Sequence, residues 1–305
     1  MTLNGFLNVL KPPGITSSGV VARVRHMLPR ASRVGHAGTL DPEAAGVLPI
    51  MLGNATRLFD YLADKEKAYV ATLRTGIETD TQDAQGRVVA QVDFAPSRED
   101  ILAVLPRFTG RIMQRPPAYS ALKRGGVRLY ELARAGKPVQ AESRETLVHS
   151  LQLGEALPGG EWLLTVRCGR GTYVRTLCHD IGQALGCGAH MVFLLRTRVG
   201  AFALADAVPL DILTPDALPG LLWPMDAPLA HLPQVHAGEA ALAACRNGNP
   251  LPLSALGLTE RPAGTGPVRV YVDGRFAGIG SWAAKHLRFE AMLLAAEESP
   301  GKERA

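Results

Sequence analysis

Short segments rich in β-branched and aromatic residues, each closed by proline or glycine, constrain the fold of this chain most. They cover residues 6–10, 67–74 and 162–168. Branched and aromatic side chains favour strands, and proline cannot continue a hydrogen-bonded strand. The sequence therefore predicts three strands that lie far apart along the chain.

Helical segments are expected between and after these strands, at residues 17–28, 97–108 and 176–185. In the first, apolar residues recur at helical spacing, Thr16 or Ser17 can cap the start, and Pro29 stops the helix. Gly186 is expected to end the last helix. With 305 residues, 47% of them hydrophobic, the chain can bury a large core and has room for a second, smaller domain.

The end of the chain predicts a separate β-rich unit. A proline-rich, apolar stretch at residues 209–233 leads into a last segment of about 70 residues. Within that segment, residues 268–272 alternate, Asp273-Gly274 favours a tight turn, and residues 275–279 can return as the partner strand. We expect domains at residues 1–230 and 231–305.

Positive charge is concentrated in one region. The chain has a formal charge of +5, whereas residues 107–144 alone contain nine Lys or Arg and two Glu. This composition predicts a basic loop-and-helix insertion that binds an anionic partner, and it is equally typical of a solvated surface arm.

Several classes of protein are disfavoured. No apolar run approaches the roughly 20 residues of a membrane span, and no signal segment is recognisable, so we expect a cytoplasmic protein. The four cysteines are expected to be reduced thiols. Cys178, Cys187 and His190, with Cys168 as a candidate fourth, are poorly spaced for a metal site, and the phosphate-loop pattern is absent, so we predict no metal and no nucleotide cofactor.

The segment around Asp41 supports two interpretations. Asp41, Pro42 and Glu43 match the cap, first-turn proline and first-turn acid of a helix. The same geometry would hold a reactive carboxylate rigidly, with Gly38 and Gly46 leaving room for a substrate. A glycosidase that uses Asp41 and Glu43 is disfavoured, because residues so placed do not face one another across a substrate.

Arg175 is a candidate partner for that carboxylate. If residues 169–175 are extended, Tyr173 and Arg175 lie on the same side. An arginine can fork onto a carboxylate, keeping it ionised and oriented. Tyr69 has the sequence context of an aromatic residue in a core strand, and His36 that of a loop histidine. Either residue can instead contact a nucleic-acid base.

Residues 35–49 closely resemble the catalytic motif of the TruB family of tRNA pseudouridine synthases. Further segments resemble family signatures in the same order, namely residues 11–17, 67–69, 115–121, 171–176 and 188–194. The resemblance covers roughly residues 5–200, and several ordered motifs are far more specific than one.

The resemblance implies an α+β fold: a mixed, mainly antiparallel sheet with flanking helices and an RNA-binding insertion. It also implies that Asp41 is the nucleophile, that Arg175 pairs with it and that Tyr69 stacks on the flipped base. The substrate would be the T-loop uridine of tRNA, conventionally U55. The enzyme would bind the T-arm of the tRNA and would use neither metal nor organic cofactor. Further expected RNA contacts are His36, Tyr173, Leu194, Lys11, Lys123 and Arg124.

Some alternatives stay open in the sequence. Asp41 can act at C1′, at C6 or on the C2′ proton. Residues 268–280 resemble part of a PUA domain, an RNA-binding β-barrel, which makes the C-terminal unit a second RNA contact. We expect a monomer with no obligatory protein partner. A guide-dependent synthase and a non-catalytic RNA-binding or RNA-folding protein are the competing hypotheses.

Overall fold

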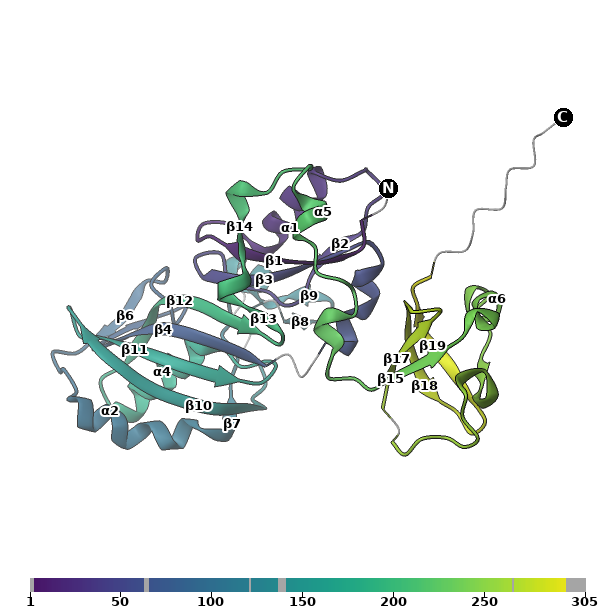
Figure 1. Cartoon of the computed structure of the whole chain (residues 1–305). Coiled ribbons are helices and arrows are strands. Elements are labelled where there is room, and N and C mark those ends of the chain that lie inside the picture. Colours follow the sequence, from purple (N-terminus) through teal and green to yellow (C-terminus); the bar gives the residue numbers. More distant parts are fainter. Residues whose placement is uncertain (1–2, 63–65, 121, 137–140, 265, 295–305) are drawn as a thin grey trace.

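The computed structural model describes residues 3–62, 66–120, 122–136, 141–264 and 266–294. Its main body is a ten-stranded sheet, with the C-terminal sheet at one end of the molecule (Figure 1). The strands of the main sheet are β1 (Gly5–Lys11), β2 (Val34–His36), β3 (Ala45–Leu52), β4 (Lys67–Thr75), β7 (Gly110–Gln114), β10 (Arg144–Leu157), β11 (Glu161–Cys168), β12 (Ala189–Val199), β13 (Phe202–Ala203) and β14 (Val208–Pro209).

The sheet is mixed and mainly antiparallel, as predicted. Its order is β14-β1-β3-β12-β4-β11-β10-β7, with β2 beside β3 and β13 beside β12. Among the described strand pairs of this sheet, only β1 with β14 and β3 with β12 are parallel. The strands predicted at residues 67–74 and 162–168 are neighbours, and Tyr69 is opposite Val166. The strand predicted at residues 6–10 is also confirmed.

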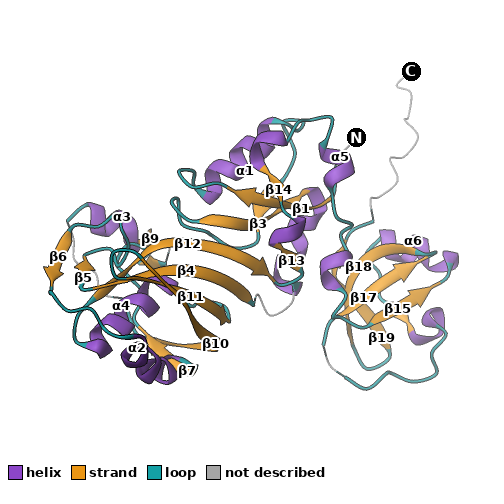
Figure 2. Ribbon diagram, turned by 60° about the vertical axis from the view of Figure 1, so that its left-hand side comes forward, coloured by secondary structure: helices purple, strands orange, loops and turns teal. Residues whose placement is uncertain are grey.

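Three helices cover the sheet near the predicted positions (Figure 2). Helix α1 (Ser17–His26) is capped by the Thr16 side chain, which accepts a hydrogen bond from the Gly19 amide. Helices α2 (Arg98–Val104) and α4 (Val174–Leu185) share a core with β4 and β11, including Ile101, Leu177 and Leu164. Apolar residues of α1 instead pack against β1 and β3.

Short elements connect these layers. A small hairpin is formed by β5 (Ile77–Thr79) and β6 (Val88–Gln91), and α5 (Leu218–Leu221) and α6 (Leu242–Arg246) are single turns. The 3-10 helices are Gly53–Tyr61, Leu105–Phe108, Leu204–Asp206, Leu210–Ile212, Ala227–Leu229, Glu239–Ala241 and Leu253–Leu256.

The helix predicted to begin after Asp41 does not form. Residues 41–44 make a turn in which the Ala44 amide donates to the Asp41 carbonyl, and the strand β3 follows. Seven of the eight residues of β3 are buried, because the strand lies between β1 and β12. A strand buried on both faces has a continuous apolar sequence, which periodicity does not separate from a buried helix. Asp41 is therefore a turn residue and not a helix cap.

The basic insertion is shorter than predicted. Strand β7 and the start of β10 at Arg144 belong to the main sheet, which leaves residues 115–143 as the inserted part. Its described elements are the hairpin of β8 (Lys123–Arg124) with β9 (Val127–Arg128), followed by α3 (Leu129–Arg134). Residues 121 and 137–140 lie outside the described part of the chain.

The C-terminal unit is a curled five-stranded sheet of order β15-β17-β18-β19-β16. Its strands are β15 (Gln234–Ala237), β16 (Leu251–Pro252), β17 (Val268–Val272), β18 (Arg275–Trp282) and β19 (His286–Met292). The predicted hairpin at Asp273-Gly274 is confirmed. Tyr61 donates to Glu290 and Asn54 donates to the Leu293 carbonyl, so this unit is joined to the main body by side-chain hydrogen bonds.

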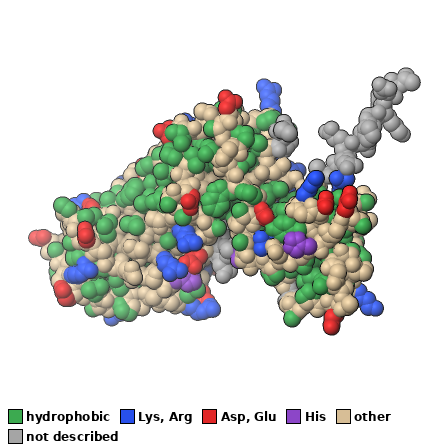
Figure 3. Space-filling model, viewed as in Figure 1, with side chains coloured by type: hydrophobic (Ala, Val, Ile, Leu, Met, Phe, Trp, Pro, Cys, Tyr) green, Lys and Arg blue, Asp and Glu red, His purple; other side chains and the backbone are tan. Residues whose placement is uncertain are grey.

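Charge does not form one continuous field on the face drawn in Figure 3. On the face drawn in Figure 3, Lys and Arg side chains are interspersed with Asp and Glu. No helix in the described part of the chain is long and apolar enough to cross a membrane. An RNA-binding surface must therefore be located from local geometry, because net charge alone does not locate it.

Candidate active site

Asp41 and Arg175 meet although 134 residues separate them. Arg175 Nε lies 3.0 Å from Asp41 Oδ2, but its N–H direction does not satisfy hydrogen-bond geometry. A second guanidinium nitrogen donates to Asp41 Oδ1 over 3.4 Å, which is long for a hydrogen bond. The Asp41 side chain is 40% exposed, whereas that of Arg175 is 6% exposed. The carboxylate is thus held electrostatically on one side and open to solvent on the other.

Arg175 is fixed by three further acceptors. Its guanidinium donates to Asp83 Oδ2 over 3.1 Å and to the carbonyls of Thr81 and Tyr119 over 3.4 and 3.0 Å. Asp83 is itself held, because its Oδ1 accepts from the Thr81 hydroxyl. Two carboxylates therefore share one buried guanidinium. In the sequence, Asp83 lies among several Asp and Thr residues, and nothing singles it out.

The local backbone around Arg175 differs from the extended segment considered above. Helix α4 begins at Val174, so Tyr173 is its N-cap and Arg175 lies in its first turn. The Tyr173 backbone is fixed by Gln114, whose side-chain amide bonds both its N–H and its carbonyl. The guanidinium of Arg144 lies over the Tyr173 ring, 5.2 Å from its centre. Tyr173 therefore stays beside Arg175 through the helix start.

The residues between β2 and β3, 37–44, form a loop that we call the Asp41 loop. Arg196 is a buried cation beneath this loop, and sequence reasoning missed it. It is fully buried, and it donates to the carbonyls of Gly38, Thr39 and Val47 over 3.1, 3.0 and 2.8 Å. Burial lowers the pKa of Arg196, while Tyr69 and Asp41 favour its charged form. Arg196 joins the segments before and after Asp41. It lies within the apolar run of β12, where no motif distinguishes it.

Tyr69 and Leu194 lie under the same loop. Tyr69 is opposite Arg196 in the β4–β12 register, and both Tyr69 and Leu194 belong to a core cluster that includes Leu40 and Ala44 on either side of Asp41. Burial raises the pKa of Tyr69 to about 12, so its phenol is neutral at physiological pH. The structure brings these two residues together with Asp41 and Arg175.

His36 lies at the end of β2, half-buried, just before the Asp41 loop. Its Nδ1 accepts a hydrogen bond from the Gly38 amide over 3.3 Å. Burial, and then the charge of Arg196, lowers the pKa of His36 below its usual 6.5. His36 is therefore a neutral side chain at pH 7 beside the entrance to the loop.

Lys11 is not placed to contact RNA, contrary to the expectation. Its side chain is fully buried, and Nζ donates to the carbonyls of Pro12, Ile15 and Pro42 over 2.7 Å each. Burial lowers the pKa of Lys11 to about 8, and the negative charges of Glu43 and Asp41 raise it only in part. Lys11 instead fixes the turn that contains Asp41.

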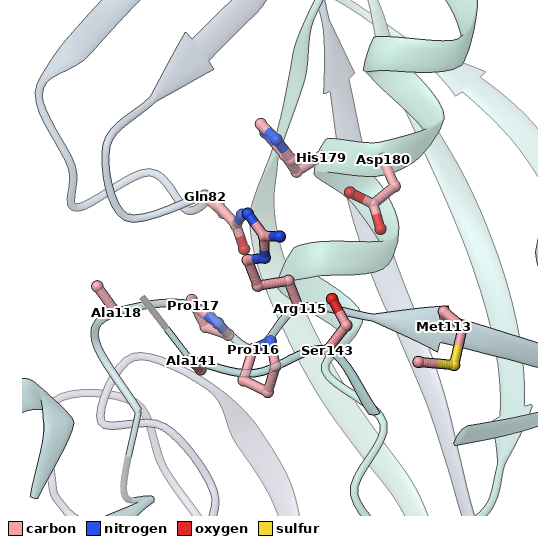
Figure 4. A pocket seen from close by; sticks show the side chains of 10 residues that line it. All are labelled: Gln82, Met113, Arg115, Pro116, Pro117, Ala118, Ala141, Ser143, His179 and Asp180. Carbon is pink, nitrogen blue, oxygen red and sulfur yellow. The ribbon is translucent and has the colours of Figure 1, made fainter. Parts of the chain in front are cut away.

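The other expected contacts on the insertion are only partly described. Lys123 and Arg124 form β8, and the positions of their side chains lie outside the described part of the structure. A cavity of about 440 Å³ separates the insertion from α4 (Figure 4). In Figure 4 the Arg115 side chain extends into it toward Gln82 and Asp180. Gln82 adjoins Asp83, so the cavity borders the contacts of Arg175.

The residues considered for a metal site have other partners. His190 Nδ1 lies 2.8 Å from the Ile77 carbonyl, and the Cys187 thiol contacts the Gly188 carbonyl. Cys178 is buried in α4, and burial raises the pKa of its thiol to about 12. Within the described residues, no group of three His, Cys, Asp or Glu is placed to share an ion.

Two family models match this chain. The TruB family pseudouridylate synthase (N terminal domain) matches residues 25–174, and the tRNA pseudouridylate synthase B C-terminal domain matches residues 175–230. A protein of Azoarcus sp. (strain BH72), named tRNA pseudouridine synthase B, is 45% identical over 295 residues, which is 95% of each chain. A protein of the same name from Heliobacterium modesticaldum is 48% identical over 81% of this chain and 82% of its own.

Two solved structures with the same fold are chains of larger assemblies. A chain in a Cbf5-Nop10-Gar1 complex is 29% identical, with a TM-score of 0.72 over 96% of this chain and 85% of its own. A chain in an H/ACA RNP bound to a substrate RNA containing 2'-deoxyuridine is 27% identical, with a TM-score of 0.72 over 96% of this chain and 86% of its own.

Proposed function

This chain belongs to the TruB family of pseudouridylate synthases, and on that premise we propose that it isomerises the T-loop uridine of tRNA, conventionally U55, with Asp41 as the nucleophile. The chain is a tRNA pseudouridine synthase, an isomerase that modifies tRNA. The observation that supports Asp41 most strongly is its position. Its half-open carboxylate faces solvent on one side and the buried guanidinium of Arg175 on the other.

The reaction exchanges one glycosidic bond for another. The bond from uracil N1 to C1′ breaks, the base rotates, and a bond forms from C5 to C1′. N1 gains a proton, and C5 loses one to water. A carboxylate serves this reaction by attacking C1′ or C6, or by taking the C2′ proton. In each case Arg175 orients the charge of Asp41 from the side away from solvent.

The target base must leave its stack to reach Asp41. Tyr69, Tyr173 and Leu194 are proposed to receive it. Tyr69 and Leu194 lie in the cluster under the Asp41 loop, and Tyr173 lies at the start of the helix that carries Arg175. A neutral phenol provides a stacking surface without the cost of burying a charge.

We extend the proposal to the whole chain as a monomer that acts in the cytoplasm without a guide RNA or a protein partner. Residues 1–230 would form the catalytic domain, and residues 231–305 a PUA-like RNA-binding domain. The relatives that span nearly the full length of the chain are named as tRNA enzymes, which supports independent action. The likeness to a chain in complex with Nop10 and Gar1 favours the guide-dependent alternative.

The deciding experiment uses purified protein alone and unmodified tRNA labelled with tritium at uridine C5. We expect tritium release to water, and none from tRNA in which U55 is replaced by cytidine. Absence of release without added factors would refute independent action. Release from the U55-to-cytidine tRNA would refute the assigned position.

One variant tests the role of Asp41, and a second variant serves as its control. We expect Asp41→Asn to bind tRNA and to lose turnover by at least about a thousandfold, because the amide retains the shape but not the nucleophile. Asp216→Asn, at an exposed position, is the control and should retain turnover. If Asp41→Asn isomerises uridine at the wild-type rate, the assignment of Asp41 is wrong.

A further inference from the structure

An open groove of about 750 Å³ lies between the end of α1, strand β2 and the 3-10 helix Gly53–Tyr61. Its lining includes three arginines, Arg25, Arg30 and Arg33, together with His36, Thr56 and Asp60. We call it the arginine groove. None of these arginines belongs to the basic insertion at residues 115–143, so the groove is a separate concentration of positive charge.

The backbone beneath the arginine groove is fixed by hydrogen bonds. The Arg33 carbonyl accepts from the Gly53 amide over 2.8 Å, and the Ser32 amide donates to the Pro29 carbonyl over 2.9 Å. The Arg25 guanidinium donates to the Val34 carbonyl over 3.2 Å, which joins the end of α1 to β2. The arginines therefore extend from a rigid base, which lowers the entropic cost of binding.

The chemistry of the groove fits an anion. Arg25, Arg30 and Arg33 are exposed at its rim, and the carboxylate of Asp60 is the one acidic group among the lining residues. Guanidinium groups bind phosphate oxygens with a planar, bidentate geometry. Because His36 is neutral at pH 7, the attraction comes from the arginines.

His36 connects the arginine groove to the active site. It lines the groove, and its Nδ1 accepts from the amide of Gly38, the residue whose carbonyl is held by Arg196 at the start of the Asp41 loop. A strand of RNA with one nucleotide at Asp41 would pass His36 as it leaves the site. Its next phosphates would then meet the arginines.

We propose that the arginine groove binds phosphates of the RNA strand that carries the target uridine, next to the nucleotide that enters the Asp41 site. This inference rests on the proposed function. The groove fixes the register of the strand without reading its bases, since phosphate contacts position RNA and base contacts specify it. It therefore contributes affinity and placement rather than the chemical step.

The chain offers a control arginine on α1, the helix that also carries Arg25. Arg23 is exposed and does not line the groove. It lies two residues before Arg25, which places it about 200° away around the helix axis. Removing Arg23 changes the net charge by the same amount as removing one groove arginine, but on the other side of α1.

The test measures tRNA affinity over a range of salt concentrations for the wild type, the double variant Arg30→Ala/Arg33→Ala, and Arg23→Ala. We expect the double variant to bind about tenfold or more weakly at low salt, with its salt slope reduced by about 1 to 2. The fold loss in single-turnover rate at saturating tRNA should be smaller than the fold loss in affinity. Arg23→Ala should have the wild-type affinity and slope.

Two results would overturn the inference. One is wild-type affinity and salt slope in the double variant. The other is an equal loss in Arg23→Ala, which would show a general charge effect. Urea unfolding of both variants detects a folding defect, and a lower unfolding midpoint in the double variant alone would assign the loss to structure and also overturn the inference. Tritium release by the wild type is measured in parallel, so failure of the proposed function is recognised separately.

Discussion

A β-carbon added to Gly46 would lie 2.1 Å from the backbone oxygen of Arg196. Gly46 has φ of +116°, and it faces Arg196 where β3 and β12 pair in parallel. The Arg196 side chain then turns back to bond the carbonyls of Gly38, Thr39 and Val47. The Asp41 loop is thus fixed by one residue twice, through its backbone and through its guanidinium.

Gly46→Ala should destabilise the fold by about 3 kcal/mol or more, because it combines a strained backbone angle with a contact that only strand separation relieves. Urea unfolding measures the loss, and turnover should also fall because the Asp41 loop shifts. Gly110→Ala is the control, since Gly110 has φ of +89° with no atom within 4 Å of its added β-carbon. It should lose only about 1 kcal/mol. Equal losses in the two variants would show that the contact with Arg196 is unimportant.

The sequence predicted the elements whose signals are local. The strands at residues 67–74 and 162–168 have branched and aromatic composition, and the hairpin at Asp273-Gly274 has turn chemistry, so each was found. The helix expected after Asp41 rests on the cap, proline and acid pattern of residues 41–43, whereas the chain makes a turn there and continues into β3, which is buried on both faces and has no alternation. Local patterns do not report which neighbours a segment will have.

The site was predictable only in part, for the same reason. The chemistry of an arginine makes Arg175 one candidate partner of Asp41, but the pairing itself comes from the family resemblance, since nothing local indicates contact across 134 residues. Asp83 and Arg196 were missed, because one lies in an ordinary polar loop and the other in an apolar strand. Lys11 is predicted to contact RNA, whereas three backbone carbonyls hold its side chain inside the fold.

Asp83→Asn should lower the single-turnover rate by about 10- to 100-fold with little change in tRNA affinity, because Arg175 loses a charged hydrogen-bond partner that orients it. Rapid-quench measurements at saturating tRNA, with a separate binding titration, distinguish the two effects. Asp80→Asn is the matched control in the same loop. Asp80 pairs with Arg87, whose side chain is 92% exposed, so its loss should leave the rate near wild type. Weaker binding with an unchanged rate would exclude an orienting role for Asp83.

Lys11→Met should destabilise the fold by about 3 kcal/mol or more, because it leaves the carbonyls of Pro12, Ile15 and Pro42 without their donor. Turnover should fall as well, since Pro42 adjoins Asp41. Urea unfolding and tritium release measure the two effects. Lys285→Met, at an exposed position, is the control and should change neither. If Lys11→Met were as stable as the control, the three bonds would contribute nothing net to folding.

His36 makes the stability of the fold depend on pH below its usual pKa. Burial, and then Arg196, lowers the pKa of His36 in the folded state from 6.5, so as pH falls the unfolded chain takes up this proton first. The contribution of neutral His36 to the free energy of unfolding is therefore complete above pH 6.5, and it is lost as the pH falls toward the folded-state pKa of His36.

Urea unfolding at intervals from about pH 7.5 to about pH 5 should accordingly show a steeper loss for the wild type than for His36→Asn, which has no proton to take up. His149→Asn, which removes an exposed histidine of β10, controls for the loss of an imidazole as such. Identical pH profiles for the wild type and His36→Asn would mean that the pKa of His36 is the same in both states.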